Sequence, residues 1–195
     1  MDLTLSDEQR LLRESVDRFI AETYDADHRR RIANDPLGFS PEIWKQFAGL
    51  GWLALPISEA YGGLGGGAVE IGILMEAFGR GLVSEPYLAT VVIGAGLISE
   101  CGSEPQKQAM LPKVADGSLL LAFAHSERPA RFDLAQVETT AKRTQEGWRL
   151  DGHKTAVIDG NAAGQIIVSA RVANEPASRA RCACSWCRPA LPVSG

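Results

Sequence analysis

Polar side chains that could bind a ligand follow a short apolar run near residue 120. Residues 119–124 are all apolar and too few for a typical helix, so the pattern predicts a strand. His125 and Ser126 come directly after it, so the strand would deliver an imidazole and a hydroxyl to a loop. Such an arrangement can hold a ligand. Ordinary strand ends are also polar, and on these residues alone a solvated turn is favoured.

Two other stretches contain groups that could bind an anion. Residues 61–67, Tyr-Gly-Gly-Leu-Gly-Gly-Gly, are similar to a phosphate-binding loop. No Gly-Lys-Ser/Thr follows them and the preceding strand is too short, so a tight or mobile turn is favoured. Residues 27–31, Asp-His-Arg-Arg-Arg, lie among acidic residues near an expected loop. We interpret them as a solvated face and expect no role for His28.

The composition of the whole chain limits the function classes. Its 195 residues can bury one core, or a helical domain plus part of a second. The 20 basic and 24 acidic residues argue against a nucleic-acid-binding surface. Residues 1–8 are acidic and no apolar run approaches bilayer length, so we expect no membrane span and a cytoplasmic location. Among the four cysteines only Cys101 lies outside the tail, so no disulfide framework is expected.

Helix signals dominate the first part of the chain. Capping patterns and apolar periodicity predict helices over residues 7–23, from Pro41 after the cap Ser40, over residues 68–80, and over residues 88–99 as a buried central helix. Ser103 opens a last short helix that Pro112 is expected to close, and the helical domain then ends near Gly117.

Strand signals follow. Residues 137–144 alternate weakly, residues 145–147 have turn chemistry, and residues 148–150 resume the alternation before a run at 155–158. The expected fold class is α+β: an all-helical N-terminal domain over residues 1–117, followed by the first part of an antiparallel β domain over residues 118–176. No order is expected in the tail, residues 177–195.

The motifs in this order resemble one protein family. The chain resembles the acyl-CoA dehydrogenases over about residues 3–172. The resemblance rests on a helical first half, followed by Phe123-Ala-His-Ser-Glu and then by Gly147-Trp-Arg-Leu-Asp-Gly-His-Lys. More narrowly, residues 131–134 and 167–171 resemble the small subunit of pimeloyl-CoA dehydrogenase. The resemblance implies an FAD-dependent enzyme that introduces an α,β double bond into a CoA thioester.

The resemblance implies a first set of cofactor residues after the predicted strand. In the family the flavin ring lies between this strand and a later one, and an oxygen-bearing side chain after the first strand hydrogen-bonds its polar edge. Here Phe123, His125 and Ser126 take that position. Glu127 matches the family's acid, although Pro129 stands one place later than the usual proline. In the following loop the family has Gly-Ser-Asp beside the acyl-CoA, and only Asp133 matches as a substrate-binding residue.

The second set of cofactor residues departs from the family pattern. Where relatives that bind flavin tightly have Trp-Ile-Thr, this chain has Ala156-Val157-Ile158 and so lacks the ring and the hydroxyl. Each loss removes on the order of 1 kcal/mol of cofactor binding. The family's catalytic base is a carboxylate in a second helical domain, C-terminal to the sheet. We therefore expect no residue of this chain to act as the base.

Two function classes follow from the resemblance. In the first, the intact form is a flavoprotein subunit that binds FAD and acyl-CoA together with a larger homologous subunit in a hetero-oligomer, and this chain alone is expected to be inactive. In the second, it is a non-catalytic structural subunit or a degenerate fragment that supplies a packing surface to a flavin-bearing partner. The altered residues at 156 and 158 favour the second class for this chain.

The tail has two interpretations. Cys182, Cys184 and Cys187 offer three thiolates, but a metal site needs a fourth ligand and Cys-x-Cys is cramped, so no metal site is expected. Alternatively, if Ser185 has a TCN codon, reading residues 182–189 in a shifted frame gives a run similar to the family's Leu-Phe-Leu-Val-Pro-Ala strand. We interpret the tail as the product of a frame shift upstream of Cys182, and expect a truncated gene product.

Overall fold

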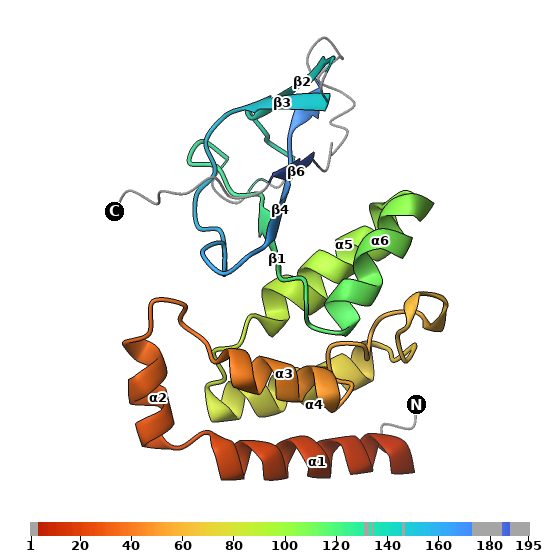
Figure 1. Ribbon diagram of the computed structural model, residues 1–195, viewed down its shortest axis with the longest axis vertical. Coiled ribbons are helices and arrows are strands. Elements are labelled where there is room, and N and C mark those ends of the chain that lie inside the picture. The colour runs from red at the N-terminus through yellow and green to blue at the C-terminus, as the bar shows by residue number, and fades with distance from the viewer. Residues whose placement is uncertain (1–3, 131–132, 134, 146, 173–184, 188–195) are drawn as a thin grey trace. The chain divides into compact units, whose positions relative to one another are not determined.

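The computed structural model describes residues 4–130, 133, 135–145, 147–172 and 185–187, the last three by their backbone alone. The chain folds into two compact units. The helical unit comprises residues 1–87 and 95–118, and the β unit comprises residues 88–94 and 119–195. The expected α+β fold class, with helices first and the start of a β domain after them, is confirmed (Figure 1).

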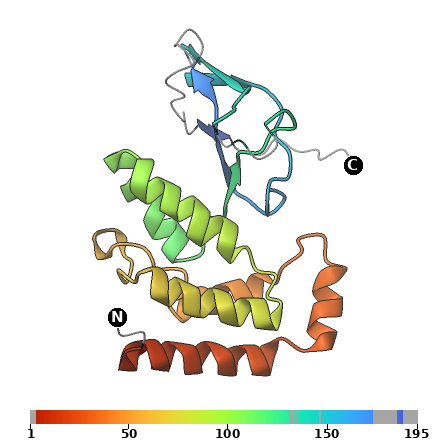
Figure 2. The same cartoon turned by 180° about the vertical axis from the view of Figure 1, so that it is seen from behind.

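The helices and strands follow one another along the chain in the order shown in Figures 1 and 2. The helices are α1 (Asp7–Thr23), α2 (Ala26–Ala33), α3 (Pro41–Gly49), the 3₁₀ helix η1 (Glu59–Tyr61), α4 (Ala68–Gly81), the π-helix η2 (Leu88–Ala95), α5 (Gly96–Cys101) and α6 (Glu104–Ala115). The strands are β1 (Leu121–Ala124), β2 (Thr140–Thr144), β3 (Gly147–Asp151), β4 (Gln165–Val168), β5 (Arg171–Val172) and β6 (Ser185–Cys187).

Side-chain caps begin the helices where the sequence predicts them. At α1 the Gln9 amide donates to the Ser6 hydroxyl over 3.2 Å, and the Gln9 side chain accepts the Ser6 amide over 3.0 Å. At α3 the Ser40 hydroxyl accepts the Ile43 amide over 3.4 Å, and Pro41 lies in the first turn. These contacts satisfy amides that a helix N-terminus leaves without partners, which explains why short local patterns predict the starts well.

Three helix expectations need correction. Residues 26–33 form a helix where the sequence indicates a solvated cluster near a loop, and the Asp25 carboxylate caps this helix by accepting the His28 amide. Pro112 lies inside α6, because the Asp116 amide still bonds to the Pro112 carbonyl and continues the last turn. The helix expected over residues 88–99 is divided into the π-helix η2 and the α-helix α5.

The core of the helical unit is a group of aromatic side chains, called here the aromatic cluster. Phe47, fully buried, lies at its centre. Its ring stacks on Phe78 with centroids 5.0 Å apart and planes 6° apart, and it packs against Trp52 at 5.0 Å and Phe19 at 5.8 Å. Tyr87 completes the cluster by meeting Phe78 edge-on. These apolar contacts join α1, α3 and α4.

The glycine-rich segment at 61–67 is a tight turn, the reading that its sequence favours. Gly62 has φ +81°, a conformation that suits glycine. A Cβ at Gly63 would lie 1.9 Å from the Ile57 carbonyl oxygen, so no side chain fits there. The segment's close packing against residues 54–57 gives it a structural role.

The β unit contains two three-stranded sheets, ordered β1-β4-β6 and β3-β2-β5. The hairpin of β2 and β3 is antiparallel, whereas β1 pairs with β4 and β2 pairs with β5 in parallel. The pairing is therefore mixed and not antiparallel throughout. Residues 185–187 pair with β4 as β6, which corrects the expectation of no order for that part of the tail. The remaining tail residues lie outside the described residues.

The segment 88–94 packs within the β unit and fixes β1. The Thr90 hydroxyl donates to the Leu121 carbonyl over 3.2 Å and accepts the Leu121 amide over 3.1 Å. A Cβ at Gly94 would lie 2.7 Å from the Leu121 Cβ, so glycine permits this close approach. A buried hydroxyl thus anchors the strand whose end carries the candidate site. In the described part of the chain, no helix combines the length and apolar character needed to cross a membrane.

Candidate functional site

The predicted ligand-binding residues stand at the carboxyl end of β1. Side chains alternate along the strand, so Ala122 and Ala124 are buried while Phe123 and His125 lie half-buried on the opposite side. The rings of Phe123 and His125 stack with centroids 5.3 Å apart and planes 25° apart. Ser126 follows and is exposed. Strand geometry therefore produces a flat aromatic surface beside an accessible hydroxyl.

Two polar atoms at this strand end lack a partner. The Nδ1 atom of His125 is buried and forms no hydrogen bond with the described residues. The Ser126 hydroxyl likewise has none recorded within the described part of the chain. Buried polar atoms in native proteins nearly always have partners, so the free His125 nitrogen points to a ligand or a water at this place.

The second predicted segment lies beside the first. The Thr155 amide donates to the Ser126 carbonyl over 2.9 Å, which brings residues 155–158 to the end of β1. These residues do not form the strand that the sequence predicts, because Ala156 has φ +51° and the chain turns after it. Ala156 is exposed and Ile158 is 54% exposed, so both side chains stand on the surface.

Four side chains buried beneath this loop form a connected network, called here the polar cluster: Glu127, Thr139, Lys154 and Ser169. The Lys154 ammonium donates to the Glu127 carboxylate over 2.8 Å, to the Ser169 hydroxyl over 2.9 Å and to the His125 carbonyl over 3.2 Å. Glu127 also accepts the Thr139 hydroxyl over 2.5 Å. Since one of these bonds ends on the His125 carbonyl, the polar cluster fixes the backbone that presents His125 and Ser126.

The polar cluster sets the protonation state of Glu127. Burial alone would raise the pKa of this carboxyl, since water no longer solvates the charge. Hydrogen bonds from Lys154 and Thr139 and from the backbone amides of Glu138 and Thr139 outweigh burial and lower the pKa of Glu127 to about 2. The carboxylate is therefore charged at neutral pH and serves as an acceptor for its neighbours, not as an acid.

Asp133 and the cysteines contribute little to this arrangement. The Asp133 carboxylate accepts the Ala135 amide over 2.9 Å, so it stabilises a local turn, and its side chain is exposed. Within the described residues no group of His, Cys, Asp and Glu is placed to hold a metal ion. The side chains of Cys182, Cys184 and Cys187 lie outside the described residues, and Cys101 is an exposed free thiol.

The sequence interpretation missed Lys154, Thr139 and Ser169. The one sequence feature that could have indicated them is Gly152, because a Cβ at this position would lie 2.4 Å from the Thr139 hydroxyl. Glycine at this place therefore admits Thr139 to the polar cluster. The partners of Glu127 lie 12 and 27 residues away along the chain, so no local pattern could pair them.

Comparison with known proteins agrees with this fold. Residues 6–118 match the family model of the acyl-CoA dehydrogenase N-terminal domain. The acyl-CoA dehydrogenase FadE12 of Mycobacterium tuberculosis is 31% identical over 172 residues, which are 85% of this chain and 42% of the relative. The chain thus spans less than half the length of that relative.

Solved structures share the architecture. The ChsE4–ChsE5 complex from Mycobacterium tuberculosis superimposes with a TM-score of 0.78 and 27% identity over 89% of this chain and 46% of that chain. An acyl-CoA dehydrogenase from Bacillus anthracis, solved with FAD, gives a TM-score of 0.78 and 28% identity over 86% of this chain and 29% of that chain. The chain belongs to the acyl-CoA dehydrogenase family.

Proposed function

We propose that the chain contributes a flavin-binding surface to an acyl-CoA dehydrogenase that acts on the α and β carbons of a CoA thioester. The observation that carries this proposal is the grouping at the end of β1: a stacked ring pair, an unpartnered buried nitrogen on His125 and an exposed Ser126 hydroxyl. Support also comes from the family match and from a relative solved with FAD.

The residues present fit FAD in a specific way. The Phe123–His125 pair offers a flat surface for the flavin ring, while Ser126 and the His125 Nδ1 atom offer hydrogen bonds to its polar edge. When bound, FAD would serve as the acceptor of a hydride from the β carbon. Lys154 and Glu127 hold the His125 carbonyl and so keep the binding surface in place. We assign no residue of this chain as the catalytic base.

The partners are part of the same proposal. The acyl-CoA substrate would reach the chain near Asp133, and a larger homologous subunit would complete a hetero-oligomer of the pimeloyl-CoA dehydrogenase type. The ChsE4–ChsE5 structure supports assembly from two different chains in a relative.

A second candidate function is a structural subunit without its own flavin. The exposed Ala156 and Ile158 favour it, because neither offers the ring or the hydroxyl that tight flavin binding uses. In this case the partner would hold the cofactor, and the surface at β1 would only pack against it.

Titration of FAD into the purified full chain, followed by quenching of flavin fluorescence, distinguishes the two candidates. We expect saturable binding that Ser126→Ala weakens a few-fold to about tenfold, because one hydrogen bond of about 0.5–1.5 kcal/mol is lost. Ile158→Thr should tighten binding by restoring a hydroxyl. Ser118→Ala, on an exposed residue of the helical unit, serves as the control. Flavin binding that neither Ser126→Ala nor Ile158→Thr changes would replace the flavin proposal by the structural one.

A further inference from the structure

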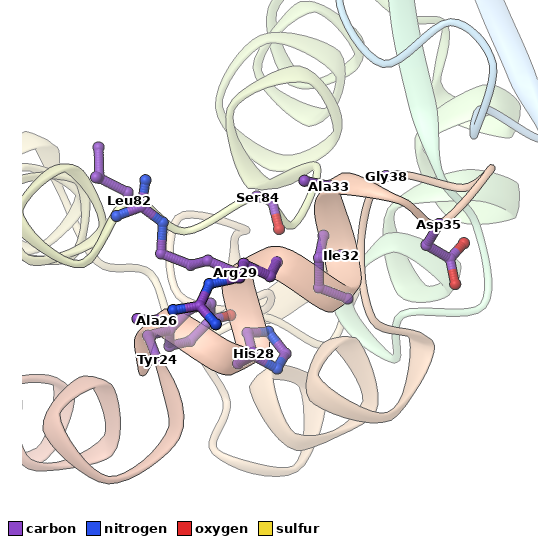
Figure 3. Close-up of a pocket in the computed structure, with 11 residues that line it drawn as sticks. Tyr24, Ala26, His28, Arg29, Ile32, Ala33, Asp35, Gly38, Leu82 and Ser84 are labelled. Carbon is purple, nitrogen blue, oxygen red and sulfur yellow. The ribbon is translucent and has the colours of Figure 1, made fainter.

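A second candidate binding place lies in the helical unit, beside α2. A cavity of about 520 Å³ opens between α2 and the residues that follow α4 (Figure 3). Its lining includes Tyr24, His28, Arg29, Ile32, Leu82 and Ser84. The proposed flavin surface uses none of these residues, so this cavity needs its own explanation.

His28 is the unusual residue of this cavity. Its backbone amide donates to the Asp25 carboxylate over 2.6 Å, and its ring meets Tyr24 edge-on with centroids 5.1 Å apart. Only 8% of the residue is exposed, yet the Nε2 atom has no hydrogen-bond partner among the described residues. An unsatisfied buried polar group costs about 1–3 kcal/mol. The sequence predicts that His28 is solvated and has no role. The prediction of a solvated side chain is wrong, because His28 is buried at the cavity wall.

Arg29 adds a positive charge that the fold leaves uncompensated. Its neighbour Arg30 pairs with Asp27 over 3.0 Å, whereas no ion pair or hydrogen bond of the Arg29 side chain is recorded in the described part of the chain. The cavity's acid, Asp35, accepts the Leu37 amide over 2.8 Å. Arg29 is thus the cation of this wall that is free to meet a ligand.

The other polar groups around the cavity are either neutral or already used. The Tyr24 hydroxyl donates to one oxygen of Glu85, and burial, followed by this contact, raises the pKa of Tyr24, so the phenol is uncharged. The other Glu85 oxygen accepts the Ser40 amide over 3.3 Å. The Ser84 hydroxyl has no partner recorded among the described residues and can donate. The groups left over are therefore an imidazole, a guanidinium and a hydroxyl.

We propose that this cavity binds a small organic anion. A carboxylate or phosphate group would accept hydrogen bonds from Arg29, His28 and Ser84, because guanidinium groups match the geometry of both oxyanions. The apolar body of the ligand would lie against Ile32 and Leu82, which line the same cavity. An anion satisfies the orphaned His28 nitrogen and neutralises Arg29 at once, whereas a cation would be repelled by Arg29.

Side-chain NMR of the isotopically labelled full chain tests this site with benzoate and phenyl phosphate as probes, at constant ionic strength. We expect saturable shifts of the His28 imidazole and Arg29 guanidinium signals. If benzoate alone saturates, the ligand is a carboxylate, and if phenyl phosphate alone saturates, it is a phosphate. Arg29→Gln should weaken binding by about tenfold or more, since it removes a charge-assisted hydrogen bond.

Arg31→Gln is the matched control, because it removes the same charge from α2 at an exposed residue that does not line the cavity. Its effect should stay below about twofold. His28→Gln tests the contribution of the imidazole separately and should also weaken binding of the probe. If this substitution of a buried residue unfolds α2, the test rests on Arg29→Gln. Three results would overturn the proposal: no saturation with either probe, equal weakening by Arg29→Gln and Arg31→Gln, or no weakening by Arg29→Gln. The first would assign the space to water.

Discussion

The aromatic cluster of the helical unit and the polar cluster of the β unit stabilise the protein by opposite means. Around Phe47, rings from three helices pack without any charge, and the contacts have broad geometric tolerance. Around Glu127, one carboxylate and one ammonium are buried together, and nearly every contact is a directed hydrogen bond. The first arrangement depends on buried area, and the second depends on each partner being present.

This difference sets how each unit should respond to damage. Loss of an apolar side chain removes contacts in proportion to its size. Loss of one member of a buried ion pair also leaves the other charged group without compensation. The aromatic cluster should therefore be insensitive to pH, and the polar cluster should respond strongly to it. Hydrogen exchange with mass spectrometry reads each unit separately and can test both statements.

The largest effect is expected from Phe47→Ala. Deletion of a fully buried ring at the centre of the aromatic cluster should lower the stability of the helical unit by about 4 kcal/mol. The loss should be the same at acidic and neutral pH, because the one titratable group of the cluster, the Tyr87 phenol, has a pKa that burial raises and so stays uncharged at both. Leu50→Ala, on a residue 46% exposed just after α3, is the control and should cost under about 1 kcal/mol. A pH-dependent loss in Phe47→Ala would break the comparison.

The next effect is expected from Lys154→Met. At neutral pH it leaves the Glu127 carboxylate buried without its cation and should lower the stability of the β unit by about 3 kcal/mol. Lys142→Met on the exposed part of β2 is the matched control and should have little effect. Exchange rates in β1 and β2 provide the measurement.

The same substitution tests the pH dependence. The folded pKa of Glu127 is lowered from 4.5 to about 2, so its contribution of about 3 kcal/mol is present above pH 4.5 and is lost as the pH falls toward 2. In Lys154→Met the pKa of Glu127 should rise toward that of the unfolded chain, and this loss of stability on acidification should shrink. An equally steep loss in wild type and variant would show that other carboxyl groups cause it.

The smallest effect is expected from Thr139→Val. The change keeps the shape of a buried side chain but removes the hydroxyl that donates to Glu127, which should cost about 1–2 kcal/mol. Thr140→Val removes the hydroxyl of a half-buried neighbour, whose contact with the Asp151 carbonyl measures 3.5 Å, and should cost under about 0.5 kcal/mol. Equal losses in the two variants would assign the effect to strand propensity.

The two clusters also differ in how far the sequence predicts them. Helix caps such as Ser6 with Gln9 are local, and apolar periodicity marks Phe47 and Phe78 as core residues, so the helical unit follows from short patterns. The sequence does not predict the helix α2, because half of its eight residues are charged and Ile32 is its single large apolar residue. The sequence predicts a helix end at Pro112, because the effect of a proline on the last turn depends on the bonds that follow it.

In the β unit the sequence predicts the strand and the loop after it but not what holds them. Ser126 and residues 155–158 do lie together, as the resemblance implies. The prediction of a strand at 155–158 is wrong, because the sequence of this run gives no indication of the positive φ at Ala156. The pairing of Lys154 with Glu127 depends on the folded path of the chain. Whether these residues bind flavin stays a prediction.

The segment 88–94 also sets the order in which the chain can fold during its synthesis. Thr90 is made 31 residues before Leu121, the strand residue that its hydroxyl holds. Until that strand leaves the ribosome, the Thr90 hydroxyl lacks the backbone partners that it has in the folded β unit. We therefore expect that the matched family domain at 6–118 does not fold completely on its own. During this interval, chaperone binding and aggregation compete with folding.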